Sequence, residues 1–264
     1  MILNANGYPI IGDDFRFDAN LDGGEFGRGF VPRDMAEFPL NSEGFCAPRA
    51  LPTFTMNEIV ERAREKTAKK TWIKDRCDRV GSKVKNQSRS NYCWNHAPVR
   101  GAECNYVLQG GKVFTLSAFW GAARIKNGRN QGGWGLQAAK YMHDVGVPVE
   151  SLHKPMDFSV DRTAETEANA KLHQLREWED IEPSDMLAIY TRIVLDMPVT
   201  VGIPAWGHEV LLTFLDVTGD NSIDPGFDNS WSTSWGNNGR GVLQGRMKRF
   251  SEAGSIVSME PASE

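Results

Sequence analysis

The chain has 264 residues, enough for one domain whose core needs no disulfide or metal to hold it. Hydrophobic residues make up 40% of it and charged residues 24%, which excludes a disordered or collagen-like chain. The net charge of −4 and the dispersed basic residues argue against nucleic acid as a partner. No apolar run is long enough for a transmembrane helix, and the start, MILNANGYPIIGDD, lacks the basic and apolar regions of a secretion signal. We therefore expect a soluble protein, located in the cytoplasm or in a virion, with no secretion signal and no membrane partner.

The first 50 residues show neither helical nor strand periodicity, and prolines interrupt them repeatedly. This composition predicts an extended N-terminal arm that lies on another surface. Within it, Asp18, Asn20 and Asp22 match the first half of a calcium-binding EF-hand loop, but Gly29 stands where that loop needs a bidentate glutamate. The pattern therefore favours a solvated turn cluster over a calcium site.

Four later segments carry apolar residues at helical spacing. The first also has a pair with capping-box spacing, Thr55 and Glu58, which marks a helix start. The predicted helices lie at about 55–70, 136–146, 164–175 and 184–197.

After residue 198 the periodicity changes to short β-branched or apolar runs separated by Gly and Asp clusters. Such runs are typical of antiparallel strands. The predicted strands are 199–203, 208–217, 241–247 and 255–260. Helices in the first part and strands in the second predict an α+β fold with two halves.

The cysteines carry no sign of a disulfide framework or a zinc site, since they are few, scattered and never in a CxxC pair. They are Cys46, Cys77, Cys93 and Cys104. A reducing compartment fits this usage best, and we expect no metal and no cofactor. The acidic loop 216–228 is better explained as a solvated hairpin tip than as a cation site.

Cys93 is the candidate nucleophile. An arbitrary cysteine is usually a small buried hydrophobe, but the polar turn 85–91 and the helical pattern that follows place this one near a helix start, where a thiolate is favoured. A thiolate nucleophile needs a proton acceptor, a group that orients the acceptor and donors for the oxyanion. His208, Asn229 and Gln87 could supply these roles.

Three segments in this order resemble the papain-like (C1 family) cysteine peptidases. KNQSRSNYCW is similar to the family's active-site segment, with a glutamine six residues before the nucleophile. GHEVLL resembles its histidine strand, and DNSWSTSWGNNGRG resembles its Asn-Ser-Trp-Gly signature. The resemblance covers roughly residues 80 to 260.

The resemblance implies hydrolysis of peptide bonds through a Cys-His-Asn triad. Cys93 would attack the carbonyl, His208 would protonate the leaving amine and Asn229 would hold the imidazole. Gln87 and the Cys93 amide would form the oxyanion hole.

The substrate-binding residues that the resemblance implies are Gly132, Gly133, Trp231 and Trp94. Gly133 would let a substrate strand lie close enough for backbone pairing, and Trp231 would shield the Asn-His contact. The implied fold has two lobes after the arm (1–50) within a domain at 51–264. A helical lobe at about 80–160 would carry the cysteine, and an antiparallel β-barrel-like lobe at about 161–264 would carry the histidine and asparagine.

The chain departs from the family pattern near the nucleophile. The usual Cys-Gly-Ser-Cys-Trp reads Ser-Asn-Tyr-Cys-Trp here, and the usual partner of the missing cysteine is absent too, which agrees with a reducing environment. Pro98 implies that the following helix either kinks or begins at Pro98. His96 is interpreted as an exposed or capping residue, with a minor alternative that it competes as the base.

The interval from Cys93 to His208 is 115 residues, below the usual range of about 130 to 150. A wall of the substrate groove is therefore expected to be missing. The remaining histidines, His143, His153 and His173, are predicted to be surface residues.

Two functions remain open at this point. The first is an active peptidase that takes a peptide or protein substrate. The alternative is a papain-fold structural or binding component of a larger assembly, such as a phage virion, with weak or no peptidase activity. The N-terminal arm, which does not resemble the family's helical prosegment, would either block the site or hold such an assembly partner.

Overall fold

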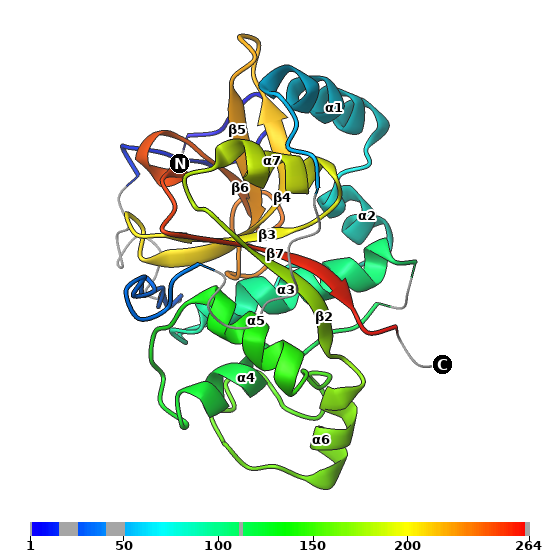
Figure 1. Ribbon diagram of the computed structural model, residues 1–264, viewed down its shortest axis with the longest axis vertical. Helices are drawn as coiled ribbons and strands as arrows, with labels where there is room; N and C mark the ends of the chain where they lie inside the picture. The colour runs from blue at the N-terminus through cyan, green and yellow to red at the C-terminus, as the bar shows by residue number, and fades with distance from the viewer. Residues whose placement is uncertain (1, 16–25, 41–50, 111–112, 262–264) are drawn as a thin grey trace.

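The computed structural model describes residues 2–15, 26–40, 51–110 and 113–261 (Figure 1). One seven-stranded sheet, in the order β1-β6-β5-β4-β3-β7-β2, runs through the molecule. Its strands are β1 (Ile10–Ile11), β2 (Leu175–Ile181), β3 (Val199–Ile203), β4 (His208–Val217), β5 (Ile223–Asp228), β6 (Arg240–Leu243) and β7 (Glu252–Met259). All neighbouring pairs are antiparallel except β1 and β6. The sheet is open, with β1 and β2 at its edges.

Helices cover both faces of this sheet (Figure 1). They are α1 (Met56–Lys69), α2 (Ile73–Arg79), α3 (Cys93–Leu108), α4 (Ala118–Ile125), α5 (Gly135–Asp144), α6 (Ala164–Lys171) and α7 (Met186–Val194), with a 3-10 turn at Gly245–Lys248. The α+β class expected from the sequence is confirmed.

The side chains of β4 alternate between two hydrophobic layers, one on each face of the sheet. Val210 and Leu212 belong to the core shared with α1 and α7, whereas Leu211 belongs to a cluster that includes Ala97 of α3. Successive side chains of a strand point to opposite faces, so one strand serves both layers. A separate cluster joins α3 and α5 to β2 and β7.

Several helix boundaries agree with the sequence-based predictions. α1 begins with the predicted capping box, in which Thr55 and Glu58 bond each other's backbone N–H. α3 begins at Cys93 and contains Pro98 in its interior, so the alternative start at Pro98 is wrong. Cys93 therefore lies at the end of the helix where the dipole is positive.

The prediction of one helix over 164–175 is wrong in its second half. α6 ends at Lys171, and β2 begins at Leu175. β1, β2, β5, α2 and α4 had no prediction, because short buried elements carry little periodicity of their own. β5 lies within the acidic loop 216–228, where only the tip forms a turn.

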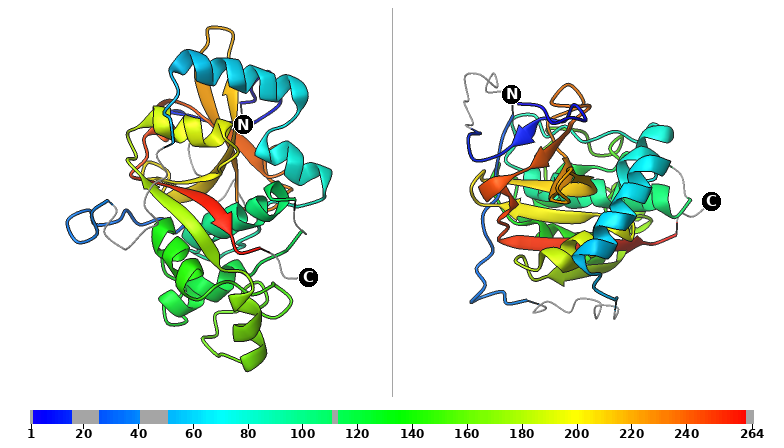
Figure 2. Two further views of the ribbon diagram at one scale, coloured as in Figure 1. Left: turned by 45° about the vertical axis from the view of Figure 1, so that its right-hand side comes forward. Right: turned by 90° about the horizontal axis from the view of Figure 1, so that it is seen from above.

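The described parts of the N-terminal arm lie on the protein itself. β1 adds to β6, and Ile11 is completely buried, so residues near it are part of the sheet. Residues 26–40, which are extended up to a turn at 35–38, run along one side of the molecule, as the right-hand view of Figure 2 shows. The candidate calcium residues at 18–23 lie outside the described residues. In the ranges that the structure describes, no helix has the length and apolar character needed to cross a bilayer.

Candidate active site

Cys93 is the first residue of α3 and is fully buried. Burial and, to a smaller extent, the nearby carboxyl group of Glu209 raise the pKa of its thiol to about 12. Hydrogen bonds from the backbone N–H groups of Glu209, Gly29 and Trp94 act in the opposite direction. The sulfur therefore lies beside the backbone of the residue that follows His208, and beside the N-terminal arm.

His208 and Asn229 are in direct contact. Nε2 of His208 lies 2.8 Å from Oδ1 of Asn229, which assigns the ring proton to Nε2. Nδ1 of His208 has no hydrogen-bond partner within the described parts of the chain, so it is the nitrogen left to accept a proton. Burial lowers the pKa of His208 to about 3, so the ring is neutral in this state.

Indole rings enclose this imidazole. The ring centroid of His208 lies 4.8 Å from that of Trp231 and 4.7 Å from that of Trp206. Trp231 is completely buried. Such a shell lowers the local dielectric, which strengthens the contact between His208 and Asn229.

A buried ion network connects the end of β5, which Asn229 follows, to the helix of Cys93. Asp228, the residue before Asn229, accepts hydrogen bonds from Nε of Arg100 in α3 at 3.0 Å and Nε of Arg240 in β6 at 2.8 Å. Burial alone would raise the pKa of Asp228, but the two guanidinium charges outweigh it and hold the pKa below its ordinary value. This network fixes the two halves of the site relative to each other.

Gln87 is completely buried, and its amide is oriented by contacts on both sides. Its Oε1 accepts a hydrogen bond from the Ser230 hydroxyl. Its Nε2 donates to the carbonyl oxygens of Ser90 and Gly27, both at 2.8 Å. Nε1 of Trp231 donates to the same Gly27 oxygen at 3.2 Å. Two side-chain donors therefore converge on one peptide carbonyl.

That carbonyl belongs to residues 26–33, which we call the arm segment. Its Gly29 oxygen accepts from Gly133 N, and its Val31 N donates to Gly133 O, both at 2.9 Å. Phe30 and Gly133 thus form a parallel bridge. The contact is tight, because a Cβ on Gly29 would lie 2.0 Å from the carbonyl oxygen of Asn91.

The remaining predicted substrate-binding residues lie along this pairing. A Cβ on Gly132 would lie 2.5 Å from Gly29 O, so a side chain there would block the arm segment. Trp94 is fully buried, packs against Gly133 and donates from Nε1 to the Gln131 oxygen at 3.2 Å. Trp94 therefore holds the backbone of residues 131–133 in place by packing and by a hydrogen bond.

Three predictions about the other histidines are wrong. His96 is buried, with Nδ1 2.8 Å from the Tyr92 oxygen and its ring against Phe119, and burial lowers its pKa to about 3. His153 and His173 are only 4% exposed, whereas His143 is exposed as predicted. A single histidine in the sequence does not show which face of a helix or which side of a loop it occupies. The burial of these three histidines therefore could not be predicted from the sequence.

Glu209 and Glu252, which no sequence motif marks, also lie at this site. Both are fully buried. The one available signal was a carboxylate immediately after His208 inside the apolar run HEVLLTFL, where a charged residue is uncommon. Among the described residues, no cluster of His, Cys, Asp and Glu side chains could hold a metal ion.

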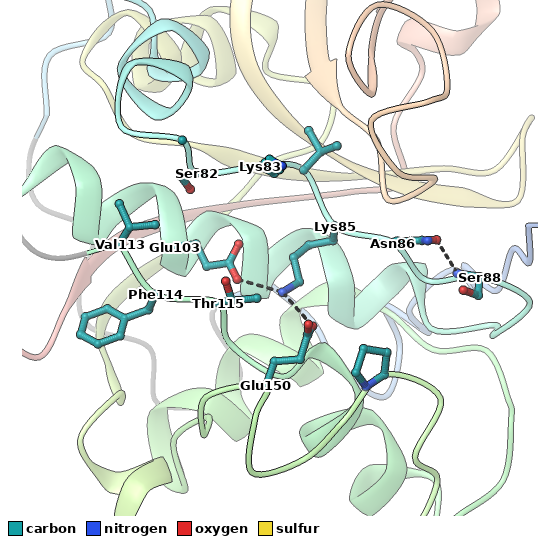
Figure 3. A pocket seen from close by; sticks show the side chains of 13 residues that line it. Ser82, Lys83, Lys85, Asn86, Ser88, Glu103, Val113, Phe114, Thr115 and Glu150 are labelled. Carbon is teal, nitrogen blue, oxygen red and sulfur yellow. Dashed lines mark hydrogen bonds and ion pairs between the residues drawn. The ribbon is translucent and has the colours of Figure 1, made fainter.

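A cavity of about 310 Å³ lies between residues 81–88 and 113–115 (Figure 3). Lys85 points into it and binds Glu103 at 2.8 Å and Glu150 at 3.6 Å. Neither Cys93 nor His208 lines this cavity. Its charged groups bind each other and join α3 to the following segments, which is a structural role.

No protein-family profile and no curated protein matches the chain by sequence. Solved structures do match. Procathepsin L 3 from the larval midgut of Tenebrio molitor superposes with a TM-score of 0.56 at 19% identity, over 67% of this chain and just under two thirds (66%) of its own. Bromelain from Ananas comosus, solved with the E64 inhibitor, gives 0.55 at 18%, over 67% of this chain and 93% of its own. Xylellain, a cysteine protease from Xylella fastidiosa, gives 0.56 at 14% and covers 96% of both chains. The chain therefore has the papain-like cysteine protease fold.

Proposed function

We propose that the protein is a papain-like cysteine peptidase that hydrolyses peptide bonds through Cys93, His208, Asn229 and Gln87. One observation carries the proposal. The arm segment already lies across the site as a peptide, with its Gly27 carbonyl bound by Gln87 and its Gly29 N–H bound to the Cys93 sulfur. A substrate peptide in this place would have its carbonyl next to a thiol and to amide donors.

In the proposed reaction each of these residues has one role. Nδ1 of His208 takes the thiol proton, and the sulfur of Cys93 attacks the substrate carbonyl carbon to form a tetrahedral oxyanion. Nε2 of Gln87 and the Cys93 N–H stabilise that oxygen. The C–N bond then breaks, and the amine leaves with the proton from His208.

Water completes the cycle. His208 removes a proton from water, the resulting hydroxide attacks the thioester, and the sulfur leaves and recovers the proton. The products are a carboxylic acid, an amine and the free thiol. Asn229 keeps the imidazole in the tautomer with the proton on Nε2, which both halves of the cycle require.

The arm segment holds this site in a latent form. Its Gly29 N–H donates to the Cys93 sulfur, so the segment offers the thiol a hydrogen-bond donor rather than a carbonyl group to attack. Burial keeps the thiol protonated and the imidazole neutral. Release of the segment would expose the site to water. Because burial is what raises the pKa of the Cys93 thiol and lowers that of the His208 imidazole, hydration brings the two values closer together and favours the thiolate-imidazolium pair.

The experiment uses the full chain, because removal of the N-terminal residues would also remove β1 from the sheet. A Phe30→Ala/Arg33→Ala variant loosens the arm segment, and a vinyl-sulfone or epoxide thiol probe reports the nucleophile. We expect Cys93 to be labelled, as mapped by mass spectrometry, and Cys93→Ser to abolish that labelling. A folded, arm-loosened variant whose Cys93 remains unlabelled would reject the proposal.

The contacts of the arm segment favour the peptidase over the assembly component. They are made with this chain's own Gly133, Gln87 and Trp231, and the side chains of Phe30 and Arg33 are buried against the molecule.

A further inference from the structure

The sheet places two carboxyl groups on either side of a glycine next to the arm segment. In the pairing of β3, Gly202 lies opposite Glu209 of β4 and opposite Glu252 of β7. Residues that lie directly opposite in a sheet point to the same face. Glu209 and Glu252 therefore flank a position that has no side chain of its own.

Phe30 of the arm segment fills the space above this glycine. A Cβ on Gly202 would lie 2.1 Å from the Phe30 ring, so the ring rests directly on the Gly202 backbone. Phe30 is the residue that pairs with Gly133. A peptide residue paired with Gly133 can thus send its side chain toward Gly202 and the two carboxyls beside it.

Within the described parts of the chain, each carboxyl group keeps one oxygen atom without a partner, although the Gly135 backbone also lies against both groups and acts to lower their pKa values against the effect of burial. Oε1 of Glu209 accepts from the Thr200 hydroxyl at 2.5 Å, and Oε1 of Glu252 accepts from Leu136 N at 2.8 Å. The Oε2 atoms of both lack a hydrogen-bond partner among the described residues, although both side chains are fully buried. Burial raises the pKa of Glu252 to about 8. Burial also raises the pKa of Glu209, and the negative charge of Glu252 raises it in the same direction. A buried, unpaired carboxyl oxygen is costly and is normally matched by a donor.

A basic side chain of the arm segment lies close to the same acids. Arg33 binds Asp180 of β2 through both nitrogens, at 2.8 and 3.1 Å, with only 2% of its side chain exposed. Its charge also lowers the pKa of Glu252 against the effect of burial. Release of the arm segment withdraws this cation and leaves Asp180, Glu209 and Glu252 together.

We propose that the recess occupied by Phe30 and Arg33 is a specificity subsite, in which Glu209 and Glu252 select a substrate with an arginine or lysine side chain at the residue paired with Gly133. The proposal rests on the proposed peptidase function and adds its substrate class. Phe30 leaves both Oε2 atoms unpaired, whereas a guanidinium or ammonium group donates to them and balances their charge. An acidic side chain would add a further negative charge and be excluded.

The test compares probes that differ at one residue. The arm-loosened Phe30→Ala/Arg33→Ala chain is treated with peptidyl vinyl sulfones that carry Arg, Leu or Glu at the residue expected to pair with Gly133, and separately with iodoacetamide. We expect the Arg probe to label Cys93 about 10- to 100-fold faster than the Leu probe, the range expected for charge-assisted hydrogen bonds, and the Glu probe to be slowest.

Glu252→Gln in the same background separates specificity from chemistry. It should bring the Arg-to-Leu ratio of labelling rates close to one, with each rate divided by the iodoacetamide rate of the same variant so that any change in the thiol itself cancels. Glu165→Gln, an exposed carboxylate of α6, is the matched control and should keep the ratio. Equal rates with Arg and Leu probes, or an Arg preference that survives both Glu252→Gln and Glu209→Gln, would overturn the subsite. Absence of Cys93 labelling by every probe would instead reject the peptidase itself.

Discussion

The side-chain amide of Gln87 donates a 2.8 Å hydrogen bond to the carbonyl oxygen of Gly27, sixty residues earlier in the chain. The donor that a peptidase would direct at a substrate oxyanion is thus occupied by the protein's own arm segment. Gln87 is held in this orientation by Ser230, next to Asn229. The glutamine, the asparagine loop and the arm segment form one connected unit, and each can be perturbed separately.

Gly29→Ala should release the arm segment. Its Cβ would lie 2.0 Å from the backbone oxygen of Asn91, which cannot move away as a flexible side chain would. We expect the rate of Cys93 labelling by a thiol probe to rise about tenfold or more, since loss of about 1.4 kcal/mol of docking free energy already gives a factor of ten. Gly219→Ala, where an added Cβ meets nothing within 4 Å, is the control and should label at the wild-type rate. Equal rates in the two variants would show that the segment does not limit access.

Gln87→Ala should reduce turnover in an arm-loosened background. Loss of one oxyanion donor costs about 100- to 1000-fold in kcat, with KM little changed, because the interaction forms in the transition state. The measurement is steady-state hydrolysis of a fluorogenic peptide. A variant with lowered Tm and unchanged kcat would assign Gln87 a purely structural role.

Asp228→Asn should destabilise the whole domain. The carboxylate is buried between Arg100 and Arg240, and removal of one partner from a buried ion network costs about 3 to 5 kcal/mol. Urea unfolding followed by tryptophan fluorescence measures this free energy. Asp144→Asn, which removes an exposed carboxylate paired with Lys140 on α5, should change it by less than about 1 kcal/mol.

The stability of the latent form should depend on pH through Glu252. Its pKa is about 8 in the folded state against an ordinary value of 4.5, so the unfolded chain releases this proton first. The contribution of Glu252 to the free energy of unfolding is therefore full below about pH 4.5 and declines as pH rises to about 8. Glu252→Gln should remove this decline, measured as the difference between the two pH profiles of Tm. Parallel profiles would contradict the raised pKa.

His96 and His208 should make the folded protein less stable as pH falls, whereas Glu252 makes it less stable as pH rises. Burial lowers the pKa of each to about 3, so their contribution is present above the unfolded value of 6.5 and is lost as pH falls from there toward 3. His96→Gln should reduce the loss of Tm between pH 6.5 and 4. The matched control is His143→Gln, since that histidine is exposed.

The sequence by itself determined the elements that carry strong local signals. The capping box at Thr55 marks the start of α1, and the runs at 199–203 and 208–217 match β3 and β4 residue for residue. Motif order was also sufficient to predict the papain-like fold at identities of 14 to 19%. Such signals are local, because capping, strand alternation and motif spacing involve residues close together in the chain.

Only the tertiary structure decided what surrounds Cys93. The arm segment has no periodicity, and its place depends on the distant Gly133, Gln87 and Asp180. Glu209 and Glu252 are 43 residues apart in the chain and share a site because β3 pairs with both of their strands. Strand neighbours are set by packing of the whole sheet, and burial rather than residue type determines the charge of these groups. No local pattern contains that information.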